Sequence, residues 1–333
     1  MGFFYGAFEV PRRKWTFLIF FSYFATYGFA LLEGETIMII SITQPCSFSQ
    51  LGNRESQEDC LCPVEANKQT SYFVVCDGVG GRDHGEVASK LVCQAIEGYL
   101  ANESCSELEA EDILQLVEHA YHTLYNNRAI CPTMATTLAF MAKTSEGMLL
   151  AHLGDSRVYQ IRKEEGIIFQ TKDHSLVNDL IEEGVITPAE AIDHPKRNVI
   201  TKCLFVTNNP ADYQTPSITL IRNIQPHDVF MLCTDGVYTK VKDKDIAEIL
   251  TSDAPLDEKA KELAMICRDS DDNNTAYLIE IDKVDGVNER LENISYIVPK
   301  SNRKTKLYRI WDFVRETLVL IVNKIRKLEE VPC

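Results

Sequence analysis

Four aspartates stand beside glycine or asparagine where β-rich runs meet turns. They occur as Asp77-Gly78, Gly154-Asp155, Asp235-Gly236 and Asp272-Asn273. Residues at strand ends lie on loops that a rigid sheet holds in place, and glycine lets the backbone approach a ligand closely. Each Asp-Gly pair alone is typical of a plain turn. Together they predict carboxylates that converge on a divalent cation, and oxygen ligands without histidine or cysteine favour Mg²⁺ or Mn²⁺.

These aspartates have to be positioned by the strands around them. Runs rich in β-branched and aromatic residues predict strands at 71–76, 134–142, 147–153, 157–162, 229–233 and 275–281. Apolar residues recur with helical spacing at 86–99 and 108–125. Only residues 154–156 separate two of the strands, so these two are expected to pair as an antiparallel hairpin. No internal repeat interrupts the region, which is therefore expected to form one continuous domain.

Six segments that carry this chemistry follow one another in a fixed order. They are GNRESQED (52–59), CDGVGGRDHGEVAS (76–89), MATTLAF (134–140), HLGDSRVY (152–159), LCTDGV (232–237) and DNNT (272–275). With these segments the chain resembles the metal-dependent serine/threonine protein phosphatases of the 2C type, especially the compact bacterial members, over about residues 39–282. The resemblance implies an α+β fold, a four-layer α-β-β-α sandwich of two antiparallel sheets flanked by helices.

The resemblance also implies a binuclear Mn²⁺ or Mg²⁺ centre at one end of the sandwich. Asp77 would bridge the two ions, and the carbonyl of Gly78 would bind one of them. Asp235 and Asp272 would hold the other ion.

Three more acidic residues belong to the implied metal site. Glu58 and Asp59 would act around the two ions, partly through bound waters. Asp155 would serve a third, weaker ion.

The implied reaction is hydrolysis of phosphoserine and phosphothreonine in proteins. Two divalent cations roughly 3.5–4 Å apart lower the pKa of a shared water, which attacks phosphorus in line with the leaving oxygen. Arg54 matches the family's phosphate-holding arginine, since a guanidinium fork grips two phosphate oxygens at once. Arg54 and Asp77 are thus the expected catalytic residues. The expected partners are phosphorylated proteins and a cognate serine/threonine kinase.

The chain departs from the family pattern at four positions without losing a ligand. Gln57 replaces the usual asparagine, Ala135 the usual glycine, and Arg82 a histidine or small residue. Val79 stands where many eukaryotic members carry the histidine thought to protonate the leaving group. Valine has no proton to donate, so water or another group, such as the nearby His84, must do so.

Composition excludes one class of partner and indicates a compartment. The formal net charge is -15, from 49 acidic and 34 basic residues, so the chain repels a polyanion and no nucleic-acid partner is expected. The 11 cysteines are an odd number without a CxxC pair, which fits reduced thiols in a cytosol. Cys60 and Cys62 have no matching second pair, so a zinc site is not predicted.

Residues 1–37 form an apolar N-terminal extension with three open interpretations. The run 15–32 is uncharged, follows three basic residues and is just long enough to span a bilayer as an anchor. That topology would place the thiol-rich remainder outside the cell. A signal peptide lacks a clear cleavage site after the run. Met38 precedes a β-like opening, so a third interpretation is that the extension is not translated. The catalytic domain is expected to span 38–283 and to lie in the cytoplasm.

Residues 284–333 are predicted to form a linker and a basic amphipathic C-terminal helix. Apolar residues recur there at alternating spacings of four and three, as in a heptad seam. They are Leu307, Trp311, Val314, Leu318, Ile321, Ile325 and Leu328. Self-association, binding to an anionic membrane surface and packing on the chain's own domain all stay open.

A calcium-binding loop is a rival interpretation of the last motif. Asp269, Asp271, Asn273 and Glu280 fit positions 1, 3, 5 and 12 of an EF-hand. Position 6 is Asn274 instead of glycine, and a strand follows in place of a helix, so this interpretation fails.

A catalytically dead phosphatase-like module is the second rival. Such modules typically lose metal ligands, whereas the expected aspartates and arginine are all present here. An enzyme is therefore expected.

Overall fold

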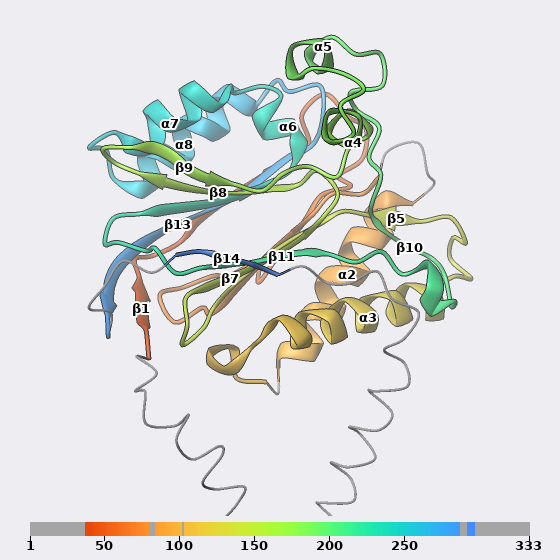
Figure 1. Ribbon diagram of the computed structural model, residues 1–333, viewed down its shortest axis with the longest axis horizontal. Helices are drawn as coiled ribbons and strands as arrows, with labels where there is room; N and C mark the ends of the chain where they lie inside the picture. Colours follow the sequence, from red (N-terminus) through yellow and green to blue (C-terminus); the bar gives the residue numbers. More distant parts are fainter. Residues whose placement is uncertain (1–36, 80–83, 102, 287–291, 297–333) are drawn as a thin grey trace, which may run out of the picture.

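The chain folds as two stacked sheets with helices on both outer faces (Figure 1). The computed structural model describes residues 37–79, 84–101, 103–286 and 292–296. Every strand pair in the two large sheets is antiparallel. The predicted α+β, four-layer α-β-β-α sandwich is thereby confirmed.

One sheet has the strand order β1-β13-β12-β8-β9, and β2 also pairs with β13. Its strands are β1 (Ile39–Ile42), β2 (Cys46–Gln50), β8 (Arg157–Arg162), β9 (Gly166–Gln170), β12 (Val229–Cys233) and β13 (Asn274–Asp285). Helices α7 (Asp243–Thr251) and α8 (Leu256–Cys267) pack on its outer face through buried apolar residues. The short helix α6 (Asp235–Tyr238) follows β12 directly.

The other sheet has the strand order β14-β11-β7-β6-β4-β3. Its strands are β3 (Cys60–Cys62), β4 (Tyr72–Cys76), β6 (Leu138–Lys143), β7 (Met148–Leu153), β11 (Ser217–Ile221) and β14 (Ile294–Tyr296). Its outer face carries α2 (Gly85–Leu100) and α3 (Ala110–Asn126), close to the two helices predicted from periodicity. A small pair, β5 (Ala135–Thr136) with β10 (Leu204–Phe205), lies beside it.

Strand β4 shows how the layers share one core. Successive side chains of a strand point to opposite faces of the sheet. Phe73 and Val75 accordingly pack between the two sheets, whereas Val74 and Cys76 pack beneath α2 and α3. All four are fully buried. Such strands are continuous apolar runs because both faces of the sheet are covered.

The predicted hairpin between 147–153 and 157–162 is wrong. Strand β7 pairs with β6 and β11, whereas β8 pairs with β9 and β12, so the two strands belong to different sheets. Residues 154–156 carry the chain across the sandwich. Gly154 has φ 101°, and a Cβ there would lie 2.6 Å from the Thr137 side chain, so only glycine fits this crossing. A three-residue connection serves a corner between sheets as well as a hairpin.

The run 134–142, predicted as one strand, is two. Strand β5 pairs with β10, and β6 starts after Thr137 and pairs with β4 and β7. At the break, the hydroxyl groups of Thr136 and Thr137 bond to the backbone of Asp77.

The ordered sheets extend past residue 283. Strand β13 ends at Asp285, and Ile294–Tyr296, predicted as linker, is strand β14 on the edge beside β11. The predicted C-terminal helix and the apolar run 15–32 lie outside the described residues. No helix in the described ranges has the length and hydropathy needed to cross a bilayer.

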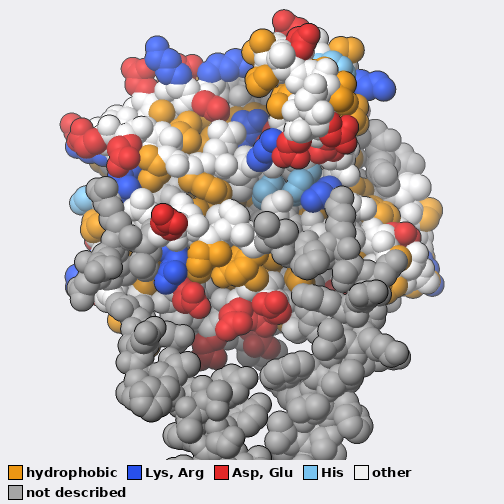
Figure 2. All heavy atoms as spheres, in the orientation of Figure 1, with side chains coloured by type: hydrophobic (Ala, Val, Ile, Leu, Met, Phe, Trp, Pro, Cys, Tyr) orange, Lys and Arg blue, Asp and Glu red, His pale blue; other side chains and the backbone are white. Residues whose placement is uncertain are grey.

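The segment 174–204 forms α4 (Leu176–Glu182) and α5 (Pro188–Ile192) before β10. Helix α5 buries none of its residues, and Val185, Ile192 and Val199 are exposed. Figure 2 shows hydrophobic side chains mixed with charged ones over this part of the surface, at the top right.

A chain that begins at Met38 is expected to fold and keep full activity. Met38 is only 4% exposed, its N–H donates to the carbonyl of Ser145 over 2.7 Å, and β1 then pairs with β13. The ordered structure thus begins at this residue within the described ranges. The turnover number and the urea midpoint of the shortened chain should match those of the full chain.

The matched control begins at Thr43 and lacks β1. It should unfold at a lower urea concentration, because Ile40 and Ile42 no longer fill the space between the sheets. If the chain from Met38 instead aggregates while the full chain is active in detergent, the N-terminal run is an integral part of the protein.

A candidate metal centre of converging carboxylates

The predicted metal ligands come from both sheets and meet at one end of the sandwich. Asp77 follows β4, Asp235 follows β12, Asp272 precedes β13, and Asp155 lies in the crossing between β7 and β8. The charges of Asp59, Asp235, Asp155 and Asp272 all act on Asp77, so the structure brings the predicted carboxylates together. Residues as far apart in the sequence as 59 and 272 therefore form one site.

The backbone of Asp77 is held by β5 and the residue after it. Its N–H donates to Thr137 Oγ1 over 2.9 Å, and its carbonyl accepts from Thr136 Oγ1 and from the Thr137 N–H, each over 2.8 Å. Burial, followed by the neighbouring carboxylates, raises the pKa of Asp77 well above its usual range. The side chain is thus fixed in a place where a negative charge is costly without a cation.

Gly78 lies where two segments of backbone come close together. A Cβ at Gly78 would be 2.7 Å from the Cα of Gly85, the first residue of α2. The N–H of Gly78 donates to the carbonyl of Glu58 over 3.1 Å, and the carboxylate of Glu58 lies next to Gly85. Glycine at both positions lets α2 and the Glu58 loop close around this end of β4.

Asp59 is almost fully buried, with 4% of its surface exposed. Its Oδ2 accepts from Thr234 Oγ1 over 2.9 Å, whereas its Oδ1 is buried without a hydrogen-bond partner. Burial is the main cause that raises its pKa to about 7, and the nearby hydroxyl groups of Thr275 and Thr234 oppose the rise. Half of this carboxylate is therefore left for a ligand outside the protein.

Asp235 repeats this arrangement at the start of α6. Its Oδ1 is also buried without a partner, although its carboxyl group lies within hydrogen-bonding reach of Asp77. Burial first, and then the charge of Asp272, raises its pKa to about 6. The backbone carbonyl of Asp235 accepts from Thr239 Oγ1 over 2.7 Å, which fixes the first turn of the helix.

Arg54 is the cation that the structure places beside these carboxylates. Its Nη2 lies 2.6 Å from Asp272 Oδ2, and its Nε donates to the carbonyl of Asp271 over 3.1 Å. The side chain of Arg54 is 49% exposed, so the guanidinium keeps a solvent-facing side. The residue predicted to hold phosphate thus contacts a predicted metal ligand directly.

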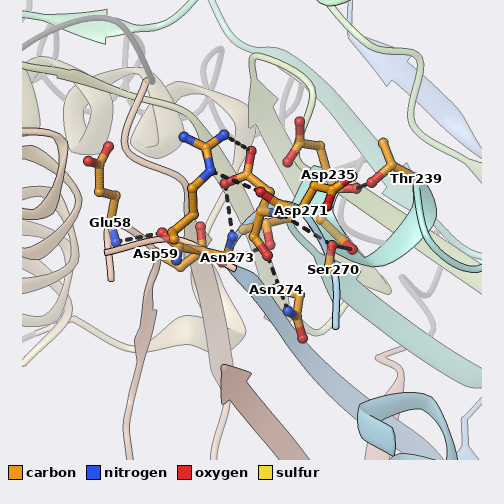
Figure 3. A network of polar contacts seen from close by, with 12 residues as sticks. Glu58, Asp59, Asp235, Thr239, Ser270, Asp271, Asn273 and Asn274 are labelled. Carbon is orange, nitrogen blue, oxygen red and sulfur yellow. Dashed lines mark hydrogen bonds and ion pairs between the residues drawn. The ribbon is translucent and has the colours of Figure 1, made fainter. Parts of the chain in front are cut away.

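Asn273 is a residue of this site that the sequence interpretation left without a role. Its Oδ1 accepts from the Glu58 N–H over 2.8 Å, and its Nδ2 donates to the carbonyls of Leu51 and Ser56 over 2.8 and 3.0 Å. Figure 3 shows this network of polar contacts. One buried amide therefore ties the Arg54–Asp59 loop to the turn that carries Asp272.

Asp155 lies on the crossing between the two sheets, where the charge of Asp235 acts on it. Burial, followed by the charges of Asp235 and Asp173, raises its pKa to about 7. Its backbone carbonyl accepts from the hydroxyl of Tyr238, at the end of α6, over 3.0 Å. The same short helix therefore contacts Asp155 at its end and presents Asp235 at its start.

The donor set fits a hard divalent cation. Buried carboxylates that raise one another's pKa, two of them with an oxygen that lacks any partner, are stabilised by positive charge between them. Oxygen donors alone suit Mg²⁺ or Mn²⁺. In the described parts of the chain, no three histidine, cysteine, aspartate or glutamate side chains form a closed ligand group, so the carboxylates surround the site without closing on one point.

The family model described as Protein phosphatase 2C matches residues 49–274, which is more than half of the chain. The chain belongs to the protein phosphatase 2C family. It is a metal-dependent serine/threonine protein phosphatase, as the six motifs predicted. The matched range runs from strand β2 to the first residue of β13 and so contains every predicted ligand.

Two bacterial phosphatases are similar to this chain. Protein phosphatase PhpP of Streptococcus pneumoniae is 30% identical over 222 residues, which cover 65% of this chain and 87% of that protein. The serine/threonine phosphatase stp of Listeria monocytogenes is 29% identical over 239 residues, which cover 69% and 92%.

Solved structures share the fold. The serine/threonine phosphatase Stp1 of Staphylococcus aureus superposes with a TM-score of 0.65 at 29% identity, covering 76% of this chain and all of that one. The catalytic domain of the phosphatase PstP, in complex with two manganese ions, gives a TM-score of 0.61 at 26% identity and covers 73% of this chain.

Proposed function

We propose that this phosphatase hydrolyses its phosphoserine and phosphothreonine substrates at a binuclear Mn²⁺ or Mg²⁺ centre. The observation that supports this most is the pair of buried, unpartnered oxygens, Asp59 Oδ1 and Asp235 Oδ1, in a cluster of carboxylates with raised pKa. The two manganese ions of the related PstP domain support the same number of ions.

We assign the ligand roles as follows. Asp77 would be shared by the two ions, the carbonyl of Gly78 would hold one, and Asp235 and Asp272 would hold the other. Glu58 and Asp59 would act around the ions, partly through bound waters, and Asp155 would serve a third, weaker ion.

The residues of the chain then divide the reaction between them. The bound ions supply the nucleophile by lowering the pKa of a water towards neutrality. Asp77 and Asp235 hold negative charge where it is needed, and Thr136 and Thr137 keep Asp77 in place. Val79 has no proton for the leaving oxygen, so water or another group has to supply it.

Phosphate release from peptides tests the proposed reaction. Phosphoserine and phosphothreonine peptides should be hydrolysed in the presence of Mn²⁺, and the matching phosphotyrosine peptide should be a much poorer substrate. Equal rates on all three peptides would contradict the proposed substrate class.

Arg54 is proposed to hold the phosphoryl group of the substrate. Replacing it with alanine should lower kcat/KM for a phosphothreonine peptide about ten- to a hundredfold, since a charge-assisted contact contributes roughly 1.5–3 kcal/mol. Arg54→Lys should fall between the two, because lysine keeps the charge but loses the planar fork. Inorganic phosphate should inhibit the alanine variant less well than the parent.

Arg128→Ala is the matched control. Arg128 stacks on the ring of Tyr125 and lies on a different element, at the end of α3. If Arg54→Ala keeps the kcat/KM and the phosphate inhibition of the parent, then Arg54 only pairs with Asp272 and does not hold the substrate. A changed Mn²⁺ requirement without a change in phosphate inhibition would lead to the same conclusion.

The surroundings of the enzyme are part of the proposal. A cognate serine/threonine kinase would supply the phosphorylated proteins that this enzyme uses as substrates. We place the catalytic domain in the cytoplasm, with membrane anchoring or self-association through the segments 1–37 and 284–333.

A further inference from the structure

His174 is buried against the crossing that carries Asp155. Its ring Nδ1 accepts from the backbone N–H of Gly154 over 3.2 Å. The backbone N–H of His174 donates to the carbonyl of Gly154 over 2.9 Å. The side chain is 9% exposed. One histidine thus holds both polar backbone groups of the residue before Asp155.

The neighbours of His174 fix its ring and its protonation. Because Gly154 offers an N–H, Nδ1 carries no proton, and Nε2–H donates to Ser217 Oγ over 2.8 Å. The ring stacks on His152 with 4.5 Å between centroids and 12° between planes. His152 in turn donates from Nε2 to the carbonyl of Lys172 over 2.9 Å. Two neutral, stacked imidazoles therefore brace the crossing.

Tyr238 fixes the crossing from the other sheet. Its hydroxyl donates to the carbonyl of Asp155 over 3.0 Å. Its ring lies 3.6 Å below the guanidinium of Arg157, which makes two 2.7 Å bonds to the carboxylate of Asp173. These contacts and those of His174 fix the backbone on either side of Asp155 and use none of its carboxylate oxygens.

We propose that His174 and Tyr238 are positioning residues that aim the carboxylate of Asp155 at the cluster formed by Asp77 and Asp235. This inference rests on the proposed metal-binding role of Asp155. The glycine that makes the crossing possible also makes it pliable, so a residue that holds both polar groups of Gly154 sets the direction of the next side chain. Replacing a group that orients a metal ligand typically lowers metal affinity or activity about 10–100-fold.

The test compares two replacements of His174 in the full-length enzyme. His174→Asn keeps an acceptor near the position of Nδ1, whereas His174→Gln moves its amide towards the position of Nε2 and loses the bond to Gly154. We expect His174→Gln to lower kcat/KM at limiting Mn²⁺ about tenfold or more, and to raise the Mn²⁺ concentration for half-maximal rate. Calorimetric titration with Mn²⁺ in the absence of substrate should show weaker Mn²⁺ binding to His174→Gln than to the parent. His174→Asn should recover most of the loss. Ser217→Ala removes the partner of Nε2 and leaves the bond to Gly154 in place. Its kcat/KM and its Mn²⁺ requirement should stay close to those of the parent.

Double-mutant cycles with Asp155→Asn separate positioning from a general effect on the fold. If His174 acts through Asp155, then His174→Gln should lower kcat/KM at limiting Mn²⁺ little further in a protein that already carries Asp155→Asn. Tyr238→Phe removes a single hydroxyl and should give the same non-additivity. It also keeps the proposal testable if the glutamine variant does not fold.

Additive losses in both cycles would overturn the positioning role while leaving Asp155 as a ligand. An Asp155→Asn variant with parent-like rates and Mn²⁺ dependence would instead overturn the proposed role of Asp155, and the positioning role with it.

Discussion

Replacing Asp77 or Asp235 with asparagine is expected to lower kcat on a phosphothreonine peptide by at least about a thousandfold. Each change removes a ligand charge from a centre whose ions contribute several kcal/mol to the transition state, and each 1.36 kcal/mol is tenfold in rate. The loss should persist at saturating Mn²⁺ for Asp77, because Asp77 is the residue proposed to be shared by both ions. Initial rates over a range of Mn²⁺ concentrations measure both effects.

Asp271→Asn is the matched control for these variants. It makes the same change of charge one residue before Asp272, on an exposed side chain whose 3.5 Å contact is to Asn53. Its kcat should stay within about twofold of the parent, as for most surface substitutions. Near-normal turnover by purified, folded Asp77→Asn or Asp235→Asn would refute the roles assigned to these residues.

The same variants separate catalysis from folding. Asp77 and Asp235 are half-buried and lie close together with raised pKa values, so one negative charge fewer should stabilise the metal-free protein at pH 8. We therefore expect Asp77→Asn without metal to have a higher urea midpoint than the metal-free parent. A variant that is more stable than the parent but inactive has kept its fold, so its defect lies in catalysis.

Local sequence patterns were sufficient to predict where the carboxylates stand. The aspartates at 77, 155 and 235 follow short apolar runs that are indeed strands, and the family resemblance predicted the two antiparallel sheets around them. Strand pairing was harder to predict. Strands β7 and β8 are buried on nearly every residue, so neither shows the alternation that would have assigned it to a sheet.

Long-range hydrogen bonds explain what the site prediction missed. Asn273 contacts Leu51 across 222 residues, and Thr234 contacts Asp59 across 175. Neutral amides and hydroxyls carry no charge pattern or fixed spacing that would identify such partners in one sequence. The one available signal was their place in or beside the segments DNNT and LCTDGV.

Helices α7 and α8 were missed for a different reason. Ile246, Ile249 and Leu250 recur with helical spacing, as do the buried residues of α8. Charged residues surround both sets, so the apolar stripe is narrow and easily overlooked.

Removal of divalent metal is expected to abolish phosphate release completely. Exhaustive chelation followed by buffer exchange should leave no measurable turnover, and added Mn²⁺ or Mg²⁺ should restore it. Oxygen ligands exchange such ions readily, so the loss should be reversible. Zn²⁺ or Ca²⁺ at the same concentration is the natural comparison, because these ions differ in preferred ligands and coordination number.

Metal binding should also stabilise the fold. A ligand at a hundred times its Kd contributes about 2.7 kcal/mol to the free energy of unfolding. For a domain of this size that corresponds to an increase in Tm of roughly 5–10 °C. Thermal unfolding with and without Mn²⁺ measures it, and the Asp271→Asn control should show the same increase.

The pH dependence of this increase follows from the carboxylates. Burial raises the pKa values of Asp59 and Asp155 to about 7 and of Asp235 to about 6, from an ordinary value of 3.8. Between about pH 4 and pH 7 the metal-free folded state thus binds more protons than the unfolded state, so its stability falls as the pH rises. Bound metal favours the ionised carboxylates, so its affinity rises across the same window.

As the pH rises, the metal-free protein becomes less stable and metal affinity increases. Both changes enlarge the Tm difference between the metal-loaded and the metal-free protein. The Tm of the Mn²⁺-loaded protein minus that of the metal-free protein should widen from pH 5.5 to pH 8, and Mn²⁺ binding at pH 6 should release protons into the buffer. Calorimetry in two buffers with different ionisation enthalpies counts those protons. A Tm difference that is independent of pH, with no proton release, would mean that the ions bind away from these carboxylates. Full turnover after chelation would mean that the reaction does not use them.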